Sequence, residues 1–211
     1  MASDDIRLDH KIILAWIRPG SSVLDLGCGD GALLDLLVRE KGAKAQGIEI
    51  NEQAIHQCVA RGLSVFHEDI DDGLTGHRDR SFDYVILNQS LQQVRKLDDV
   101  MQEALRVGCQ VIVGFPNFAH YRARCQIFFL GKTPVTPSLP YEWHDTPNLH
   151  FLSISDFVAY CRRRRIRIDK AAWFAESRQV RCLPNLFALA GVFLISVGRG
   201  ERTEHAGMRD E

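Results

Sequence analysis

The nine residues from 23 to 31 read Val-Leu-Asp-Leu-Gly-Cys-Gly-Asp-Gly, and they decide the fold expected for this chain. A short apolar run enters a turn that holds Gly27, Gly29 and Gly31, and a helical spacing of leucines begins beyond it at Leu33. Glycine lacks a Cβ, so the backbone there turns tightly and lets a ligand approach closely. A strand, a glycine-rich turn and a helix in this order predict a ligand site at the carboxyl end of the strand.

Outward from this turn, segments with strand and helix patterns alternate along the chain. The runs 84–87 and 111–113 are continuously apolar, as is typical of parallel strands buried on both faces. The expected strands are 22–27, 44–50, 63–67, 82–88, 110–115, 167–175 and 190–197, and the expected helices are 6–17, 32–40, 52–60, 97–106 and 155–163. This alternation predicts an α/β fold with a mostly parallel sheet, helices on both faces and an antiparallel last strand after a loop at Pro184-Asn185.

The alternation breaks after the fifth expected strand. Residues 116–153 are too rich in proline for regular structure and too rich in aromatic residues for a disordered linker. We therefore expect an ordered insertion over one edge of the sheet, with a short helix near 121–129. Residues 1–198 would form one domain with this insertion inside it, followed by a polar tail at 199–211.

An acidic residue follows the glycine turn at the sequence separation expected of a ribose-binding acid. Glu49 ends the second expected strand 22 residues after Gly27, where an acid accepts hydrogen bonds from ribose hydroxyls. The glycines follow G-x-G-x-G spacing, not the G-x-G-x-x-G of dinucleotide sites, and Asp25 and Asp30 accompany them. Two carboxylates repel a pyrophosphate but suit a positively charged ligand such as S-adenosylmethionine. For the glycines alone, a turn that only packs a helix on a sheet remains an alternative.

The turn resembles the acidic-x-G-x-G-x-G motif of class I methyltransferases, which have a Rossmann-like fold. The resemblance implies S-adenosylmethionine or S-adenosylhomocysteine as cofactor, with Glu49 on the ribose and Asp69 near the adenine amino group. It also places Asn88 at the start of the motif that follows the fourth strand. The expected cofactor-binding residues are Asp25, Gly27, Cys28, Gly29, Asp30, Gly31, Glu49, Ile50, Asp69, Ile70 and Asn88.

Longer motifs give a closer resemblance, which covers about residues 7–198. They include Phe-Asp-Tyr-Val-Ile-Leu-Asn-Gln-Ser-Leu-Gln-Gln-Val at 82–94, Val-Gly-Phe-Pro-Asn-Phe-Ala-His-Tyr at 113–121 and Thr-Pro-Asn-Leu-His at 146–150. On these segments the chain is similar to the MetW family of bacterial methionine-biosynthesis proteins. The resemblance implies a role beside homoserine O-acyltransferase, and it implies no particular methyl acceptor.

Catalytic residues do not emerge from the pattern. Methyl transfer from a sulfonium needs chiefly in-line positioning, with a base only when the acceptor carries a proton. The polar or aromatic residues expected near the cofactor mouth are Asn88, Gln89, Ser90, Asn117, His120, Tyr121, His144 and His150. Two interpretations of Asn88 stay open: it binds the ligand, or it hydrogen-bonds the backbone at the end of a strand. For His150 the simpler interpretation is that it fixes a loop and does not transfer protons. No triad or metal set is present, so the catalytic residues stay unassigned.

Three aromatic residues of the insertion, Tyr121, Tyr141 and Trp143, allow several roles. Three interpretations are open: these residues line an acceptor pocket, they form a partner surface, or, most simply, they fill the insertion's own core. The first functional hypothesis is thus a cofactor-binding accessory protein of homoserine O-acyltransferase. An active small-molecule methyltransferase is the alternative, and a nucleic-acid methyltransferase comes third.

Composition narrows the classes of protein. Lys plus Arg is 26 against 27 for Asp plus Glu, which does not favour a nucleic-acid binder. The basic cluster Arg162–Arg165 with Arg167 more simply closes a helix than binds nucleic acid. No apolar run reaches the roughly 18 residues of a membrane span, and residues 1–11 lack a secretory pattern. The six cysteines form no C-x-x-C pair, so we expect mostly buried, reduced thiols, no metal and a cytoplasmic location.

Overall fold

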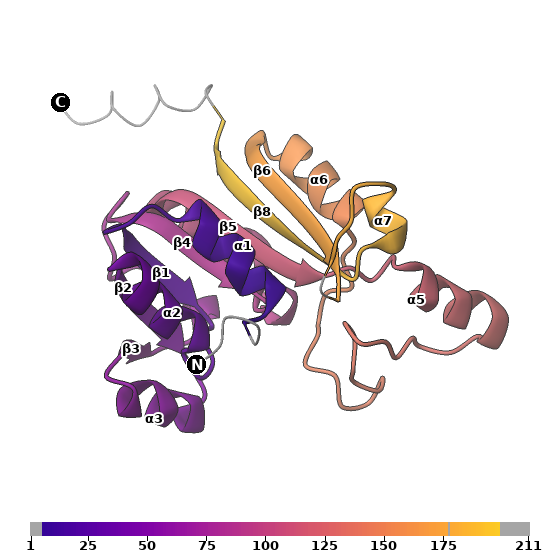
Figure 1. Ribbon diagram of the computed structural model, residues 1–211, viewed down its shortest axis with the longest axis horizontal. Helices are drawn as coiled ribbons and strands as arrows, with labels where there is room; N and C mark the ends of the chain where they lie inside the picture. Colours follow the sequence, from indigo (N-terminus) through magenta and orange to yellow (C-terminus); the bar gives the residue numbers. More distant parts are fainter. Residues whose placement is uncertain (1–5, 177, 199–211) are drawn as a thin grey trace.

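Eight strands form one sheet in the order β3-β2-β1-β4-β5-β8-β6-β7 in the computed structural model, which describes residues 6–176 and 178–198 (Figure 1). The strands are β1 Ser22–Leu26, β2 Lys44–Glu49, β3 Ser64–His67, β4 Phe82–Asn88, β5 Gly108–Pro116, β6 Ile166–Ala175, β7 Arg178–Gln179 and β8 Ala190–Val197. The strands β3, β2, β1, β4 and β5 are parallel to one another, whereas β8 runs antiparallel to both β5 and β6. The mostly parallel sheet with an antiparallel last strand is therefore confirmed.

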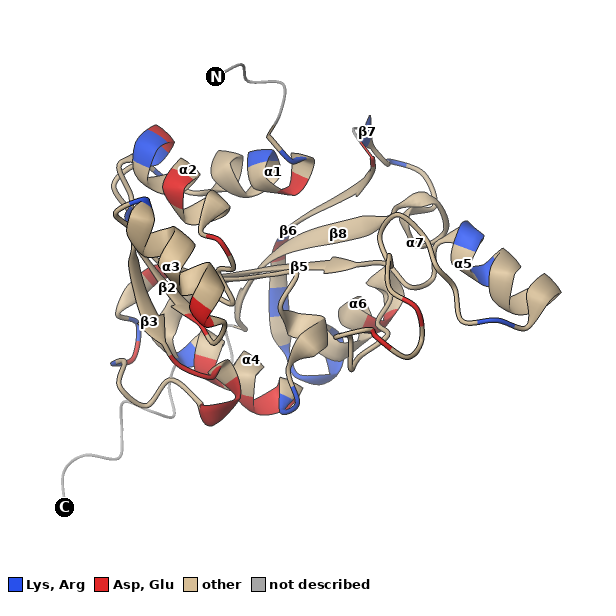
Figure 2. Ribbon diagram, turned by 90° about the horizontal axis from the view of Figure 1, so that it is seen from below, with Lys and Arg blue, Asp and Glu red and all other residues tan. Residues whose placement is uncertain are grey.

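Helices cover both faces of this sheet. The α-helices are α1 Leu8–Trp16, α2 Ala32–Lys41, α3 Glu52–Ala60, α4 Leu97–Val107, α5 Tyr121–Cys125, α6 Ile154–Arg163 and α7 Pro184–Phe187. Single turns are η1 Ile70–Asp72 and η2 Leu91–Gln93, both 3₁₀, and the π-turn η3 Gln126–Leu130. Figure 2 shows the sheet close to edge-on, with α1 and α2 on one side and α4 and α6 on the other.

The two faces follow from the period of two along each strand. Val23 and Tyr84 belong to one apolar cluster with the inner faces of α1 and α2. Their neighbours Leu24 and Val85 belong to the other cluster, together with α4 and α6. Successive side chains of a strand point to opposite faces, so a continuously apolar strand supplies both clusters.

The insertion after β5 is ordered at both of its ends. Asn117 is fully buried, and its Nδ2 donates to the backbone oxygens of Ala188 at 2.8 Å and Asn185 at 3.2 Å. At the other end, the backbone nitrogens of Leu149 and His150 donate to Gln92 O at 2.8 and 3.0 Å. Between these ties, α5 continues into η3 and points away from the sheet (Figure 1).

Some local features differ from the expectation. Pro184 begins the short helix α7 instead of lying in a loop, because proline at the first helical position needs no hydrogen-bond partner for a backbone N–H. The two-residue strand β7 pairs with the end of β6 and has too short a pattern to predict. The proposed tail 199–211 lies outside the described residues, and the division into one domain and a tail stays a prediction.

Candidate functional site

The three glycines after β1 meet three different environments. An ideal Cβ on Gly27 would lie 2.8 Å from Ser90 Cβ, and one on Gly31 would lie 2.6 Å from Leu63 Cδ1. A Cβ on Gly29 would meet no atom within 4 Å. All three have positive φ, at 76°, 55° and 76° in chain order. Gly27 and Gly31 are therefore needed for packing as well as for backbone angle, whereas Gly29 faces open space.

Glu49 binds the glycine turn from the end of β2. Its Oε2 accepts a hydrogen bond from Gly29 N at 2.8 Å, and its Oε1 accepts from Ile50 N at 3.0 Å and Asn51 N at 2.9 Å. The parallel register of β1 and β2, which pairs Leu26 with Ile48, brings the two strand ends together. A carboxylate has about four acceptor positions. These three N–H groups occupy three of them, so one remains for a ligand donor, and release of the Gly29 bond would free a second.

Asp25 is buried at the end of β1, directly before the turn. Within the described residues its carboxylate accepts no hydrogen bond from any other side chain or backbone group. Burial, with a smaller contribution from the Glu49 charge, raises the pKa of Asp25 to about 7. A buried carboxylate without a partner is costly, which is why the pKa is raised, and a positively charged or hydrogen-bonding group beside it would relieve that cost.

Ile50 lies beside Glu49 with 59% of its surface exposed, next to the open space at Gly29. An exposed apolar side chain next to polar groups suits the flat face of a nucleoside. Ile70, half-buried in η1, packs against the main apolar cluster instead.

Asp30 and Asp69 are already engaged. Asp30 is exposed, and its Oδ1 accepts from Ala32 N at 3.2 Å while its Oδ2 pairs with Arg61 at 3.1 Å. Asp69 accepts from Asp71 N at 2.9 Å and from Arg95 at 2.8 Å. Asp30 therefore stabilises the start of α2 and its contact with α3. The adenine contact expected of Asp69 stays a prediction, and it would share that carboxylate with Arg95.

Asn88, at the end of β4, bonds a helix and not the backbone. Its Nδ2 donates to Asp9 Oδ2 at 3.1 Å, and Asp9 is also paired with Arg7 at 2.6 Å. Asn88 Oδ1 and the nearby Ser90 Oγ are buried without a hydrogen-bond partner among residues 6–176 and 178–198. Oδ1 lies against Gly114 and Oγ lies beside Gly27, so a ligand donor reaches either oxygen only if its side chain turns. Gln89, between them, has a positive φ of 65°.

Asp9 and His10 were not predicted as site residues. Both are buried on α1, and His10 has its pKa lowered mainly by burial, so its imidazole is neutral at neutral pH. A signal was present, because Asp9 shares the apolar face of the helix with Ile12 and Ile13 at helical spacing. A charged residue in such a stripe needs a buried partner, but the stripe does not say which one.

Cys28 sits inside the turn and packs against Cys58 and Leu34. The Cys58 thiol donates to Gly29 O at 3.2 Å. Burial raises the pKa of both thiols above their ordinary value, so they are poor nucleophiles at neutral pH. The expectation that most cysteines are buried is wrong, because Cys109, Cys125 and Cys182 are exposed; all six are free.

The remaining polar candidates lie in structural bonds. His150 Nε2 lies 2.9 Å from Val94 O, which agrees with its interpretation as a loop-fixing residue. His120 Nδ1 accepts from Arg122 N at the start of α5, and Asn117 ties the insertion to α6 and α7. His144 is exposed and lies 3.6 Å from Glu142. None of these side chains forms a hydrogen bond with a residue of the glycine turn.

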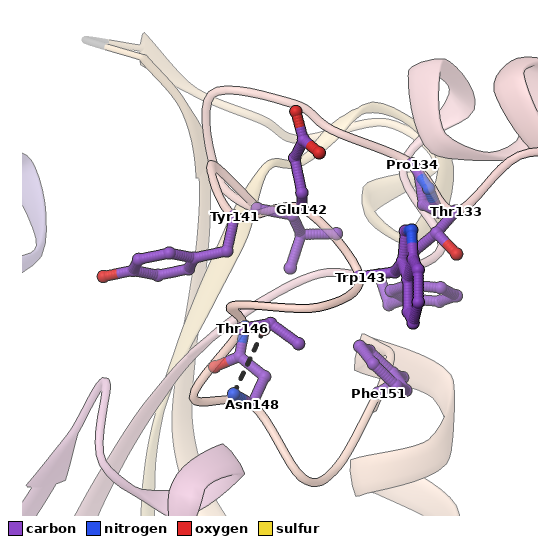
Figure 3. A pocket seen from close by; sticks show the side chains of 10 residues that line it. Thr133, Pro134, Tyr141, Glu142, Trp143, Thr146, Asn148 and Phe151 are labelled. Carbon is purple, nitrogen blue, oxygen red and sulfur yellow. Dashed lines mark hydrogen bonds between the residues drawn. The ribbon is translucent and has the colours of Figure 1, made fainter.

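The aromatic residues of the insertion do not fill its core. Trp143 is 74% exposed, and Tyr121 and Tyr141 are also exposed, so the simpler interpretation as core residues is wrong. Figure 3 shows Trp143 between Pro134 and Phe151, with Tyr141 pointing away from them. The cleft between them has a free volume of about 10 Å³, room for no more than a water molecule. It is too small for a nucleoside.

The basic cluster after α6 is partly neutralised. Arg164 pairs with Asp98, and its guanidinium carbon lies 6.0 Å from the centre of the Tyr160 ring. Arg167 bonds Asp169 at 2.6 Å. In the described part of the chain, no helix is long and apolar enough to cross a membrane, and no three metal-binding side chains lie together.

Comparison with known proteins agrees with this geometry. A family model described as methionine biosynthesis protein MetW matches residues 7–195. The chain belongs to the MetW family. The bifunctional methionine biosynthesis protein MetXA/MetW of Rhodopirellula baltica is 34% identical over 190 residues, which are 85% of this chain and 30% of that protein. This member of the family therefore spans less than a third of that relative.

Solved structures share the fold of this MetW family member. A SAM-dependent methyltransferase from Archaeoglobus fulgidus superposes with a TM-score of 0.63 at 16% identity, over 88% of this chain and 93% of that one. An S-adenosylmethionine-dependent methyltransferase from Mesorhizobium loti gives 0.64 at 18% identity, over 88% and 95% of the chains. The class I methyltransferase fold and the methionine-biosynthesis family, both expected from the motifs, are confirmed.

Proposed function

We propose that this protein binds S-adenosylmethionine at the glycine turn and acts as an accessory or regulatory partner of homoserine O-acyltransferase in methionine biosynthesis. The observation that carries the cofactor assignment is the pair of carboxylates at adjoining strand ends. Asp25 is buried without a hydrogen-bond partner among the described residues, and Glu49 lies across the turn from it. Together they favour a ligand that combines positive charge with hydroxyl donors.

The residues present fit this cofactor. Glu49 would hold the ribose hydroxyls, the open side of Gly29 would admit the chain of the ligand, and Ile50 would cover the adenine. Asp25 would face the cationic end, and Asn88 Oδ1 and Ser90 Oγ, once turned toward the ligand, would accept its ammonium protons. When bound, S-adenosylmethionine supplies a transferable methyl group on a cationic sulfur.

The partner assignment is supported by the name of the Rhodopirellula relative, a bifunctional MetXA/MetW protein. MetX is the homoserine acyltransferase, so that relative joins the proposed partner and a MetW part in one chain. Two functions that occur in one polypeptide often belong to one assembly. S-adenosylmethionine forms from methionine, so a protein that binds it beside an early enzyme of the pathway would report pathway output. S-adenosylmethionine can regulate the partner in this way only if it binds one state of the complex more tightly than another.

An active small-molecule methyltransferase is the second candidate, and His10 is the observation that favours it. The imidazole is neutral, is buried next to Asp9 and feels the Asp30 charge of the glycine turn. A neutral imidazole near the cofactor would accept a proton from an acceptor hydroxyl or amine.

One experiment separates the two functions. The purified protein is mixed with homoserine O-acyltransferase, and co-elution and acyl-transfer rate are measured with and without S-adenosylmethionine. We expect a complex and a ligand-dependent rate. Absence of both, together with turnover of S-adenosylmethionine on an added metabolite, would replace the accessory function by the methyltransferase.

A further inference from the structure

Residues 121–132, which we call the arm, end in a tip that is apolar on every side. α5 continues into η3, and four consecutive residues, Ile127 to Leu130, form its last turn before Gly131. Phe128 is 81% exposed and Phe129 is 74% exposed, with Ile127 and Leu130 also exposed. Four consecutive residues cover about one full turn of helix, so the tip has no polar face. A helix that is apolar all round is stable only when it is buried.

No described part of this chain buries the tip. The arm points away from the sheet (Figure 1). The rings of Phe128 and Phe129 contact each other edge to face, with centroids 4.9 Å apart. The base of the arm, by contrast, is held firmly. Arg124 Nε donates to Ala119 O at 2.6 Å, and the Gln126 amide exchanges two 2.9 Å hydrogen bonds with the backbone of Val135. The arm is therefore a fixed projection with an exposed apolar end.

The charge of the arm restricts what covers it. Arg122, Arg124 and Lys132 lie on it, and no Asp or Glu occurs between residues 104 and 141. Figure 2 shows the arm with basic and no acidic residues. Two copies of this protein meeting arm to arm would bring like charges together. A complementary partner instead has an apolar groove bordered by carboxylates.

We propose that the arm is the segment of this protein that inserts into homoserine O-acyltransferase, in an apolar groove with an acidic border. This inference rests on the proposed partnership and adds the surface and the chemistry of the contact. Phe128 and Phe129 are the anchors, since large aromatic side chains in desolvated pockets carry most of an interface's affinity. Lys132 contributes charge at the rim, where it mainly speeds association.

The test compares binding of purified acyltransferase to the wild type and to three variants by calorimetry and by association kinetics. The double variant Phe128→Ser/Phe129→Ser removes the anchors, and Lys132→Glu reverses a rim charge. Val59→Ser changes another exposed apolar residue, which is 60% exposed on α3, and is the control. S-adenosylmethionine affinity, measured for every variant, shows that each one is folded.

We expect the double variant to lose at least about thirtyfold in partner affinity, as for two anchor residues. Lys132→Glu should slow association at low salt, and Val59→Ser should match the wild type. S-adenosylmethionine affinity should stay unchanged throughout.

Wild-type affinity in the double variant would overturn the arm inference while leaving the partnership intact. Failure of the wild type to bind the acyltransferase would overturn both. Arm-dependent dimers in light scattering, or arm-dependent sedimentation with phosphatidylglycerol vesicles, in place of acyltransferase binding would assign the tip to a second copy or to a lipid surface.

Discussion

The backbone N–H of Gly29 donates a hydrogen bond to Glu49 Oε2 at 2.8 Å, across the mouth of the sheet. The carboxylate proposed to bind ribose thus also holds the glycine turn. A ribose hydroxyl that approaches Glu49 must use the remaining acceptor position or replace the Gly29 N–H. Ligand binding is therefore coupled to the conformation of the turn.

Glu49→Ala should weaken S-adenosylmethionine binding by about 1.5–3 kcal/mol, the contribution of hydrogen bonds to a charged group. Titration calorimetry measures the loss. Glu52→Ala, three residues further on and exposed at the start of α3, should bind as the wild type does. Unchanged affinity in folded Glu49→Ala would remove this residue from the site, and tight NAD binding would overturn the cofactor assignment.

Gly29→Val should abolish cofactor binding, because the new side chain enters the open space in front of the turn. It should lower stability by only about 1–2 kcal/mol, from the strain of a positive φ. Gly62→Val is a close control, since Gly62 also has a positive φ and no atom within 4 Å of its Cβ position. Equal ligand affinity in the two variants would show that the turn does not contact the ligand.

The raised pKa of Asp25 predicts a pH dependence of ligand binding. The carboxylate is ionised above a pH of about 7 and protonated below it. Affinity for the cationic S-adenosylmethionine should therefore fall as pH is lowered, by up to about tenfold per pH unit below the pKa. Asp25→Asn should bind more weakly than the wild type at high pH and lose this dependence. A wild-type affinity that is flat with pH would contradict the role of Asp25.

The same group predicts the sign of a stability change. Because the folded-state pKa of Asp25 lies above the unfolded value of 3.8, the native state holds a proton that the unfolded state releases. Its stabilising contribution is complete below the unfolded pKa and is lost as pH rises through about 7. At alkaline pH, the free energy of unfolding of Asp25→Asn should exceed that of the wild type by up to about 4 kcal/mol. Urea unfolding measures this difference. Lower stability of the variant at that pH would contradict this account.

Asp9→Ala should destabilise the protein by about 1–3 kcal/mol, because it leaves the partly buried Asn88 amide without its partner. Asp35→Ala, which breaks the exposed pair with Arg39, should cost no more than about 0.5 kcal/mol. Urea unfolding measures both. Equal small losses would mean that the bond between α1 and β4 is not needed for the fold.

Trp143→Ala and Tyr141→Ala should weaken association with homoserine O-acyltransferase more than they weaken cofactor binding. Both side chains are exposed on the insertion, and large aromatic residues are enriched at interface cores. A loss of about tenfold or more in partner affinity is expected for an interface aromatic. Full partner affinity in both variants would exclude Tyr141 and Trp143 from the contact surface and leave the arm as the proposed contact.

Much of this protein could be predicted from the sequence, because the features concerned are local. Apolar runs and helical spacings set the strands and helices, and the glycines of 27–31 require a tight turn wherever they occur. Glu49 could be placed at the mouth because parallel strands end at one edge of the sheet. The same reasoning predicted the fold class, whereas the family followed from the resemblance of longer motifs such as 82–94, 113–121 and 146–150.

Only the tertiary structure decided which distant groups meet. Periodicity shows that Asp9 lies on a buried face, but not that it bonds Asn88, 79 residues away. The requirement for Gly31 comes from Leu63 and Cys58, which approach it from other elements. The aromatic residues of the insertion illustrate the same limit, since sequence could not distinguish the exposed Trp143 from a core residue. Which side chains meet depends on packing between elements far apart in the chain, and no local pattern encodes that distance.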